Sequence, residues 1–572
     1  MPANAGRSNT AAGRSETAAG AGRSDAVADA VGAAIAGAGV RHAFGVLGSG
    51  NLVVTNALRR AGVAFHHARH ECGAVCMADG YARTSGEVGI CSVHQGPGLT
   101  NAITGLTEAT KSRTPLLVLS GEAPAAALTS NFRIAQEDLV RAVGAGSDRI
   151  HSAQSAPGDA LRAFTRAVRE RRPVVLMLPI DLQSQPAAGD PPAPQPAPPA
   201  VFVPSAAAVA EAADRLAAAR RPAIIAGRGA VLARARHALE RLGALTGALL
   251  ATSAPANGLF TGLPYALGIS GGFASPTAAR LLAQADLVLL VGASGNHWTT
   301  RHGELIADGA SVVQIDDEPG AIGRHLPVDA GLLGDAAATV EAIIAELERR
   351  GHHATGWRTA DTAARIAAGD WLHEPYEDAG TDAWIDPRTL SIELQNRLPA
   401  TRAVAVDSGH SLGYPAMFLS VADPRAWVFP NGFQSVGLGL GNAIGAAVAH
   451  PERVTVAAIG DGGAFMSLAE IETAVRLELR LLVVIYDDAA YGAEVHHFGP
   501  LGHDVDAVRF PQCDLAAIAR AAGARGEVVR RPEDLVALEE WLADPDPGPL
   551  VLDAKVNPTV CAEWLAEAFR GG

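Results

Sequence analysis

Short apolar runs alternate with helix-length segments along most of the chain. From residue 25 the pattern predicts a helix to about residue 37, then an apolar strand over 43–47 that ends at a glycine loop, 48–50. Further apolar strands are predicted over 89–93, 116–120 and 173–178. The repeated order of strand, loop and helix predicts an α/β domain built on a parallel sheet.

The same alternation returns twice. A second unit has predicted strands over 222–226, 287–291 and 312–315, each ending in glycine or Asp at the edge where open α/β sheets hold ligands. A third unit begins near residue 386, with predicted strands over 404–406, 454–459, 481–486 and 550–554. The fold class expected is therefore α/β, with three doubly wound parallel-sheet domains.

Composition marks the boundaries between these units. Residues 1–24 repeat Ala-Gly-Arg-Ser without an apolar segment, which predicts a disordered tail rather than a signal peptide. Residues 186–204 contain eight prolines and are expected to form an extended linker. The mixed polar stretch 351–385 is expected to be a second linker. The predicted domains are thus residues 25–185, 205–350 and 386–572.

Charge and hydropathy exclude several classes of protein. The 572-residue chain carries 46 Lys plus Arg against 60 Asp plus Glu, a net charge of -14, which disfavours nucleic acid or an anionic membrane as a partner. No apolar run approaches the roughly 18 residues of a membrane helix. A small anion held by local groups remains compatible with this charge.

Cysteine and lysine are scarce. The five cysteines form neither a disulfide framework nor a zinc pattern, so we expect a reducing, cytoplasmic setting. Cys72 and Cys76 are one helical turn apart, an arrangement compatible with two metal ligands, but no second pair exists and buried thiols are favoured. Lys111 and Lys555 are the only lysines, which makes Schiff-base aldolase chemistry improbable.

The strongest local signal lies between residues 454 and 492. One buried strand ends at Gly460-Asp461-Gly462-Gly463, a helix is predicted over 466–477, and the next strand ends at Asp487-Asp488. Because neighbouring parallel strands end at the same edge, Asp461 and Asp488 are expected to offer oxygens to a hard cation such as magnesium. The glycines and the helix start that follows suit phosphate oxygens. Taken alone, Gly-Asp-Gly is equally typical of a tight turn.

The spacing adds weight to this signal. Gly460-Asp461-Gly462, followed by 24 residues and a paired acid, resembles the signature of thiamine diphosphate enzymes, which usually have Asn-Asn where this chain has Asp487-Asp488. The resemblance implies thiamine diphosphate and Mg²⁺ as cofactors, held by the Asp461 and Asp488 side chains and the Ala490 carbonyl. The extra negative charge would weaken diphosphate binding unless it is offset.

A carboxylate far away in the sequence completes the resemblance. Glu71 stands in a His-Glu-x-x-Ala context, where an isolated Glu is commonly an exposed acid at a helix start. In the family, the matching Glu pairs with the cofactor's pyrimidine ring and so activates the thiazolium carbon. Family members bring this Glu to the diphosphate domain of another subunit. The resemblance therefore implies at least a homodimer, with a homotetramer also open.

Further segments match the same family. Gly96-Pro97-Gly98 resembles its Gly-Pro-Gly loop, and Gln434-Ser435-Val436 stands where it holds the aminopyrimidine, with Val436 as a small wedge beneath the cofactor. The resemblance divides the chain into pyrimidine-binding, middle and diphosphate-binding domains. Besides Glu71, it implies a cofactor-binding set of Ser408, Gly409, His410, Ser411, Gln434, Val436, Gly460, Asp461, Gly462, Gly463, Ala464, Tyr491 and Gly492.

The reaction itself stays open between related chemistries. The layout resembles acetolactate synthases, which implies decarboxylation of a 2-oxo acid and ligation of the acyl-anion equivalent to a second carbonyl. Glu494, and the absence of the Arg and Trp of those enzymes, favour the alternative of a simple decarboxylase or hydroxyketone lyase. A non-catalytic nucleotide-binding homologue is the third alternative.

Four residues are candidates for catalysis: Glu71, His94, Gln136 and Glu494. His94 is also compatible with capping a strand end, and Glu494, which precedes two histidines, with a solvated helix face. No motif decides whether the middle domain binds FAD or another nucleotide, since Gly227-Arg228-Gly229 fits a plain turn equally well. The partners expected are a small 2-oxo acid and a carbonyl acceptor.

Overall fold

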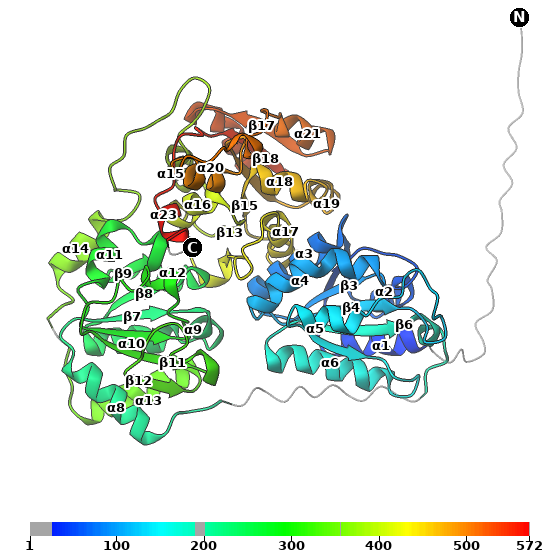
Figure 1. The fold of residues 1–572 in the computed structure, drawn as a ribbon, viewed down its shortest axis with the longest axis horizontal. Helices are drawn as coiled ribbons and strands as arrows, with labels where there is room; N and C mark the ends of the chain where they lie inside the picture. Colours follow the sequence, from blue (N-terminus) through cyan, green and yellow to red (C-terminus); the bar gives the residue numbers. More distant parts are fainter. Residues whose placement is uncertain (1–25, 189–200, 355, 571–572) are drawn as a thin grey trace, which may run out of the picture.

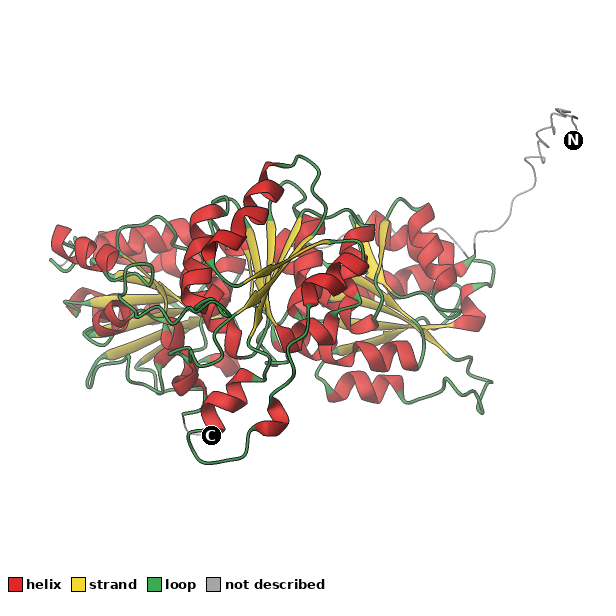
Figure 2. Cartoon of the chain, turned by 90° about the horizontal axis from the view of Figure 1, so that it is seen from above, coloured by secondary structure: helices red, strands yellow, loops and turns green. Residues whose placement is uncertain are grey.

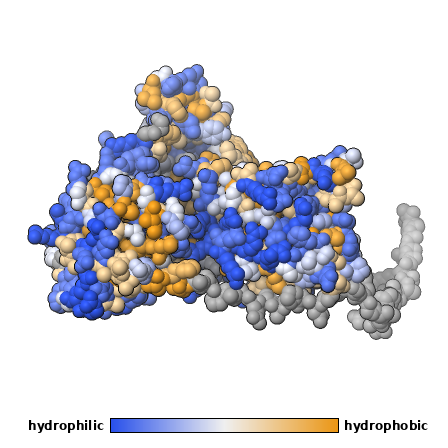
Figure 3. Space-filling model, turned by 60° about the horizontal axis from the view of Figure 1, so that its bottom comes forward, coloured by the Kyte–Doolittle hydropathy of each residue, from blue (hydrophilic) through white to orange (hydrophobic). Residues whose placement is uncertain are grey.

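The computed structural model describes residues 26–188, 201–354 and 356–570. Three six-stranded parallel sheets, each flanked by helices, confirm the predicted fold class (Figures 1 and 2). On the face drawn in Figure 3, hydrophilic residues cover much of the surface and apolar residues form scattered patches. The predicted tail, 1–24, and most of the predicted linker, 186–204, lie outside the described residues.

The first sheet has the strand order β2-β1-β3-β4-β6-β5. Every strand predicted in this unit is confirmed, with ends shifted by a few residues. Two short strands at the sheet edges were missed because they are only partly buried and carry polar residues. The strands are β1 (His42–Gly45), β2 (Ala64–His67), β3 (Gly89–Val93), β4 (Leu116–Glu122), β5 (Gly146–Arg149) and β6 (Val174–Pro179).

The third sheet repeats this order as β14-β13-β15-β16-β18-β17. The helix predicted over 466–477 is wrong in extent: α18 (Asp461–Ser467) starts directly after its strand, and α19 (Glu470–Arg476) is a separate helix. An acidic first residue at a helix start interacts favourably with the helix dipole. The strands are β13 (Ala403–Val406), β14 (Trp427–Val428), β15 (Thr455–Gly460), β16 (Leu481–Asp487), β17 (Arg525–Val529) and β18 (Leu550–Lys555).

The middle sheet has a different strand order, β12-β11-β10-β7-β8-β9. All its strands are parallel, and successive strands are added outward in opposite directions from the central pair of β7 and β10. The stretch predicted as a second linker contains an unpredicted helix, α14 (Ala360–Ala368), and the backbone carbonyl of Gly369 accepts a 2.6 Å hydrogen bond from Ser275 in the middle unit. The strands are β7 (Pro222–Ala226), β8 (Leu249–Thr252), β9 (Ala266–Ile269), β10 (Leu287–Val291), β11 (Ser311–Asp316) and β12 (Ala330–Leu333).

The first and third units pack together through two glycine-containing helices, α3 (Glu71–Ser85) and α17 (Gly439–Ala449). A Cβ atom at Gly80 would overlap the carbonyl of Asn442, and one at Gly445 would overlap the carbonyl of Met77. The two backbones therefore approach as closely as glycine permits. The two units share one hydrophobic core across this contact.

Candidate active site

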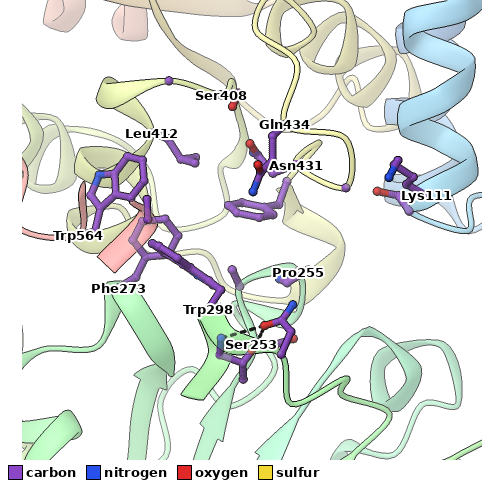
Figure 4. Close-up of a pocket in the computed structure, with 18 of the residues that line it drawn as sticks. Lys111, Ser253, Pro255, Phe273, Trp298, Ser408, Leu412, Asn431, Gln434 and Trp564 are labelled. Atoms are coloured by element: carbon purple, nitrogen blue, oxygen red, sulfur yellow. Dashed lines mark hydrogen bonds between the residues drawn. The ribbon is translucent and has the colours of Figure 1, made fainter. Parts of the chain in front are cut away.

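A cavity of about 1320 Å³ lies at the carboxyl edge of the third sheet and is bounded on its other side by the middle unit (Figure 4). It brings together almost every residue predicted in the diphosphate-binding domain. The exception is Ala464, which is buried in the hydrophobic core behind the loop. The predicted residues that line the cavity are Ser408, Gly409, His410, Ser411, Gln434, Val436, Gly460, Asp461, Gly462, Gly463, Asp488, Ala490, Tyr491, Gly492 and Glu494.

Two carboxylates converge in this cavity from neighbouring strands. Asp461 follows β15, and Asp488 follows β16, which pairs with β15 in parallel. Burial, together with the nearby charges of Asp488 and Asp487, raises the pKa of Asp461 to about 8. A group of negative charges with so little solvent is a site that a divalent cation would stabilise. These donors therefore fit the metal that the motif implies.

The additional acid of the motif, Asp487, is directed away from the cavity. Its side chain forms a buried ion pair with Lys555, which also pairs with Asp553 at 2.8 Å. Although burial alone would lower it, the two carboxylates raise the pKa of Lys555, so the lysine is a cation. The extra negative charge at 487 is thus offset inside the protein. Sequence reasoning did not find this role, and the rarity of lysine was the available signal.

Asp407 joins two loops of the cavity and was also missed. Its buried carboxylate accepts hydrogen bonds from the backbone N–H groups of Ser408, Gly437 and Leu438, at 2.9 to 3.1 Å. Burial raises the pKa of Asp407 to about 6. A Cβ atom at Gly463 would overlap this carboxylate, so glycine is required there. Asp407 therefore holds the phosphate-side loops against each other.

The segment expected to hold the aminopyrimidine is conformationally unusual. Gln434 has φ 60°, a left-handed conformation that costs a non-glycine residue energy and is most common at functional sites. The side chain of Val436 lies over the glycine loops, 3.3 Å from a Cβ built at Gly463 and 3.9 Å from one built at Gly409. The cavity is therefore lined by a small apolar side chain where the wedge is expected.

Glu494 lies in the first turn of α20 (Gly492–Phe498) and lines the cavity. The two histidines that follow it do not join it in one group. His496 packs against His410 with ring centroids 4.6 Å apart, and burial lowers its pKa to about 4. His497 stacks on Phe569 at 3.9 Å. Glu494 is therefore a candidate acid or base without a histidine partner.

His410 anchors the end of the chain beside the cavity. Its Nε2 accepts the backbone N–H of Ala562 at 2.9 Å, so this nitrogen is unprotonated when the bond is made. Close by, Trp564 contacts Phe273 and Trp298 of the middle unit edge-to-face, with centroids 5.7 and 5.5 Å apart (Figure 4). The C-terminal segment and the middle unit thus form one aromatic wall of the cavity.

Glu71 lies outside this cavity, at the carboxyl edge of the first sheet. It begins α3, and its Oε2 accepts a hydrogen bond of 3.0 Å from Asn101. His94 lies nearby, because a Cβ atom built at Gly98 would be 3.0 Å from the Cβ of His94 and 3.4 Å from Oε1 of Glu71. His94 itself contacts the glycine loop through Ser49, at 3.2 Å. The first unit therefore presents a second, separate cluster.

Gln136, a candidate for catalysis, lies outside the cavity of the third unit and borders a separate pocket of the first unit. Its Oε1 accepts the backbone N–H of Gly96 at 2.8 Å, and its Nε2 donates to the carbonyl of Gly121 at 3.1 Å. The side chain is buried and its amide is fully used. Gln136 therefore supports the Gly96-Pro97-Gly98 loop from below.

Gly227 and Gly229 of the middle unit allow the segment after β7 to pack closely against the segment after β10. Cβ atoms at Gly227 and Gly229 would come too close to the backbone of Gly292, which follows β10. Gly227 directly precedes α9 (Arg228–Leu232), so the segment is a helix start rather than the plain turn considered from the sequence, and a packing constraint explains its two glycines. In the described residues no helix is long and apolar enough to cross a membrane.

Three parallel α/β units, with an acidic, glycine-lined cavity at the carboxyl edge of the third, define an α/β protein with a candidate cofactor site. Comparison with family models agrees unit by unit. Residues 25–141, 209–343 and 407–554 match the N-terminal, central and C-terminal domains of thiamine pyrophosphate enzymes. The chain belongs to the thiamine pyrophosphate (thiamine diphosphate) enzyme family.

Several curated proteins are similar over nearly the whole chain. A probable 2-ketoarginine decarboxylase of Pseudomonas aeruginosa is 34% identical, covering 89% of each chain. A sulfoacetaldehyde acetyltransferase of Rhodobacter capsulatus is 30% identical over 93% of each. The large subunit of acetolactate synthase isozyme 2 of Escherichia coli is 29% identical over 91% of this chain and 93% of its own. The protein is therefore a thiamine diphosphate-dependent decarboxylase or carboligase, and the non-catalytic alternative is wrong.

Proposed function

We propose that the enzyme binds thiamine diphosphate through Mg²⁺ and decarboxylates a 2-oxo acid. The observation that carries this proposal is the convergence of Asp461 and Asp488 in a glycine-lined cavity, where burial and the second acid raise the pKa of Asp461. The Ala490 carbonyl would complete the protein ligands. Gly460, Gly462 and Gly463 would let backbone N–H groups approach the phosphates.

The proposed active unit is a homodimer, and a homotetramer would contain the same pair. Glu71 lies outside its own chain's cavity, so it needs the cavity of another subunit. The carboxyl edge of the first unit exposes Leu52, Val53, Phe132 and Ile134, with exposed fractions of 41 to 44%. Apolar side chains gathered around a functional edge are typical of an interface. The proposed cytoplasmic location rests on the sequence alone.

Each part of the chain has a proposed task in turnover. When bound, thiamine diphosphate would supply the nucleophilic carbon and the electron sink that decarboxylation of a 2-oxo acid requires. Glu71 would hold a proton against the pyrimidine ring and so favour the tautomer that takes the thiazolium proton. Val436 and Gln434 would orient the cofactor. The aromatic wall would exclude water and receive the substrate side chain.

Glu494 distinguishes the two fates of the substrate carbon after decarboxylation. Its place in the cavity favours proton delivery, which releases a free aldehyde. Ligation to a second carbonyl is the other candidate. It is supported by the size of the cavity and by the names of the relatives, an acetyltransferase and an acetolactate synthase.

The test is incubation with thiamine diphosphate, Mg²⁺ and a panel of 2-oxo acids that includes pyruvate and a guanidino-substituted acid, the latter because a relative is named for 2-ketoarginine. Carbon dioxide release and product mass are followed together. We expect carbon dioxide with a free aldehyde, and Glu494→Gln should shift the products from aldehyde toward hydroxyketone. An unchanged product ratio would exclude the role of Glu494, and a hydroxyketone in the unaltered enzyme would establish ligation.

A further inference from the structure

The chain that leads into Glu71 is held by a helix of the third unit. The backbone N–H groups of Arg69 and His70 both donate to the carboxylate of Glu470, at 3.2 and 2.9 Å. Glu470 is the first residue of α19 and is 1% exposed. A contact between residues 400 positions apart thus fixes the backbone immediately before Glu71.

The surroundings of Glu470 are shaped for a carboxylate. Thr473 donates its hydroxyl to Oε2 at 2.7 Å, which orients the group. A Cβ atom at position 73 would overlap Oε1, so Gly73 permits the carboxylate to approach the first turn of α3. Hydrogen bonds from backbone N–H groups to a buried charge are among the stronger ones in proteins. Glu470 is therefore the main attachment of this segment to the third unit.

Weaker contacts extend the same attachment along α19. Arg69 pairs with Glu472 at 2.6 Å, and Arg476 donates to the carbonyl of His67 at 2.7 Å. Arg69 and Arg476 are partly exposed, so their contributions are screened by solvent. All of these contacts lie on one side of α19, facing the segment 67–70. The buried Glu470 carboxylate is expected to dominate.

The position of α19 links the two candidate clusters within one chain. It follows α18, which begins with the proposed metal ligand Asp461. Within one chain, α18 and α19 thus connect the proposed cation site to the backbone that leads into Glu71 of that same chain. Glu71 does not line its own chain's cavity. Under the proposed function it serves the cofactor in the partner subunit.

We propose that Glu470 is a positioning residue for Glu71 and that, through it, the cofactor site of one subunit supports catalysis at the other site of the dimer. This inference rests on the proposed function, in which Glu71 acts on the partner's cofactor. Without the carboxylate, two N–H groups lose their acceptor and the start of α3 is free to shift. A displacement of about 1 Å at a catalytic group can cost about 100-fold in rate.

The first test is Glu470→Gln, which keeps the shape but removes the negative charge and one of the two acceptor oxygens, so the hydrogen bonds from Arg69 and His70 are no longer charge-assisted. We expect kcat to fall by about 10-fold or more, by the sensitivity of catalysis to positioning. The dissociation constant of thiamine diphosphate should change less than about 3-fold, since the cavity itself is intact. The near-ultraviolet circular-dichroism band of the iminopyrimidine should weaken, because that tautomer depends on Glu71.

Glu472→Gln is the matched control, because it removes an exposed carboxylate from the same helix and should leave kcat within about 2-fold. Should Glu470→Gln fail to fold, Glu470→Asp, which draws the carboxylate back by one methylene, is assayed instead with the same expectations. An unchanged kcat, or a loss of cofactor affinity as large as the loss of kcat, would overturn the inference.

The second test uses mixed dimers purified with two different tags. A dimer of one Glu470→Gln chain and one Asp461→Asn chain keeps one intact site, and should show about half of the wild-type activity although each parent homodimer is impaired. If Glu470 instead served the cavity of its own chain, both sites of this dimer would be defective. Activity near that of the parents would then overturn the inference.

A second mixed dimer, Glu71→Gln with Asp461→Asn, separates the inference from the proposed function. Recovered activity in this dimer confirms that Glu71 acts across subunits. If this dimer recovers and the Glu470→Gln dimer does not, the inference is wrong and the proposed function stands. If neither recovers, Glu71 does not act across subunits, and both the proposed dimeric site and the coupling are wrong.

Discussion

The first and third sheets have the same strand order, yet their carboxyl edges are built for different tasks. In the third, Asp461 after β15 lines a cavity, and the buried Asp407 after β13 holds two loops of that cavity together. At the equivalent places in the first, β1 leads to a glycine loop and β3 to His94, while Glu71 begins the helix after β2.

Under the proposed function, this difference separates cofactor binding from cofactor activation. The edge of the third sheet gathers buried carboxylates that a divalent cation would stabilise, which suits the proposed binding of a diphosphate through Mg²⁺. The edge of the first sheet presents the carboxylate of Glu71 at the start of α3, close to the Gly96-Pro97-Gly98 loop that Gln136 supports. One topology serves both tasks because ligand-binding loops vary while the sheet and its helices keep their arrangement.

The largest expected effect comes from replacing one carboxylate by an amide at the carboxyl edge of the first sheet and one at that of the third. Glu71→Gln should lower kcat by about 10²–10⁴-fold, the usual contribution of acid-base catalysis, while thiamine diphosphate still binds. Asp461→Asn should instead weaken binding of Mg²⁺ and thiamine diphosphate. Calorimetric titration together with steady-state kinetics separates the two. Loss of cofactor binding in Glu71→Gln would remove the distinction between the edges.

A smaller effect is expected from breaking the buried ion pair between Lys555 and Asp487. Lys555→Met leaves Asp487 as an unpaired buried acid beside the diphosphate site, and should weaken thiamine diphosphate binding by about 10-fold or more. Adding Asp487→Asn removes that charge and should restore affinity to within about 3-fold of the unaltered enzyme. Affinity that stays low in the double variant would contradict the assigned role of the Asp487 charge, and would direct attention to Asp553, the second partner of Lys555.

The acidic edge should also make stability depend on pH. Without a cation, Asp461 has a pKa raised from 3.8 to about 8 by burial and by Asp488. Its contribution to stability is then complete below pH 4 and is lost as pH rises toward 8. Mg²⁺ with thiamine diphosphate should therefore raise the melting temperature more at pH 8 than at pH 6. Asp461→Asn should abolish this difference, and an equal rise at both values would contradict the assignment.

The smallest effect is expected from replacing Gln136, the buried side chain that supports the Gly96 loop of the first unit. Gln136→Leu leaves the N–H of Gly96 without an acceptor and should lower the free energy of unfolding by about 1–3 kcal/mol. KM for the 2-oxo acid should stay within about 3-fold, because the side chain faces the protein interior. Urea denaturation and kinetics measure both quantities. A large rise in KM with unchanged stability would restore Gln136 as a substrate-binding residue.

Most of the fold was predictable from local patterns. Apolar runs separated by helix-length segments located every central strand of the first and third sheets, because a strand buried on both faces must be apolar along its length. In the middle sheet the same pattern missed β8, although that strand is interior and buried. The edge strands β2 and β14, and the break between α18 and α19, were missed because partly exposed or very short elements carry no comparable pattern. The acidic strand ends were found because their position along the chain determines where they lie in a parallel sheet.

What the sequence determined by itself was therefore the set of units, the acidic cavity and the candidacy of Glu71. Tertiary structure alone decided that Lys555 neutralises Asp487, that Gln136 faces inward, that Ala464 lies in the core, and that Glu470 holds the segment before Glu71. The reason is physical: these contacts join residues brought together by strand order and helix packing. Local periodicity contains no information about such partners.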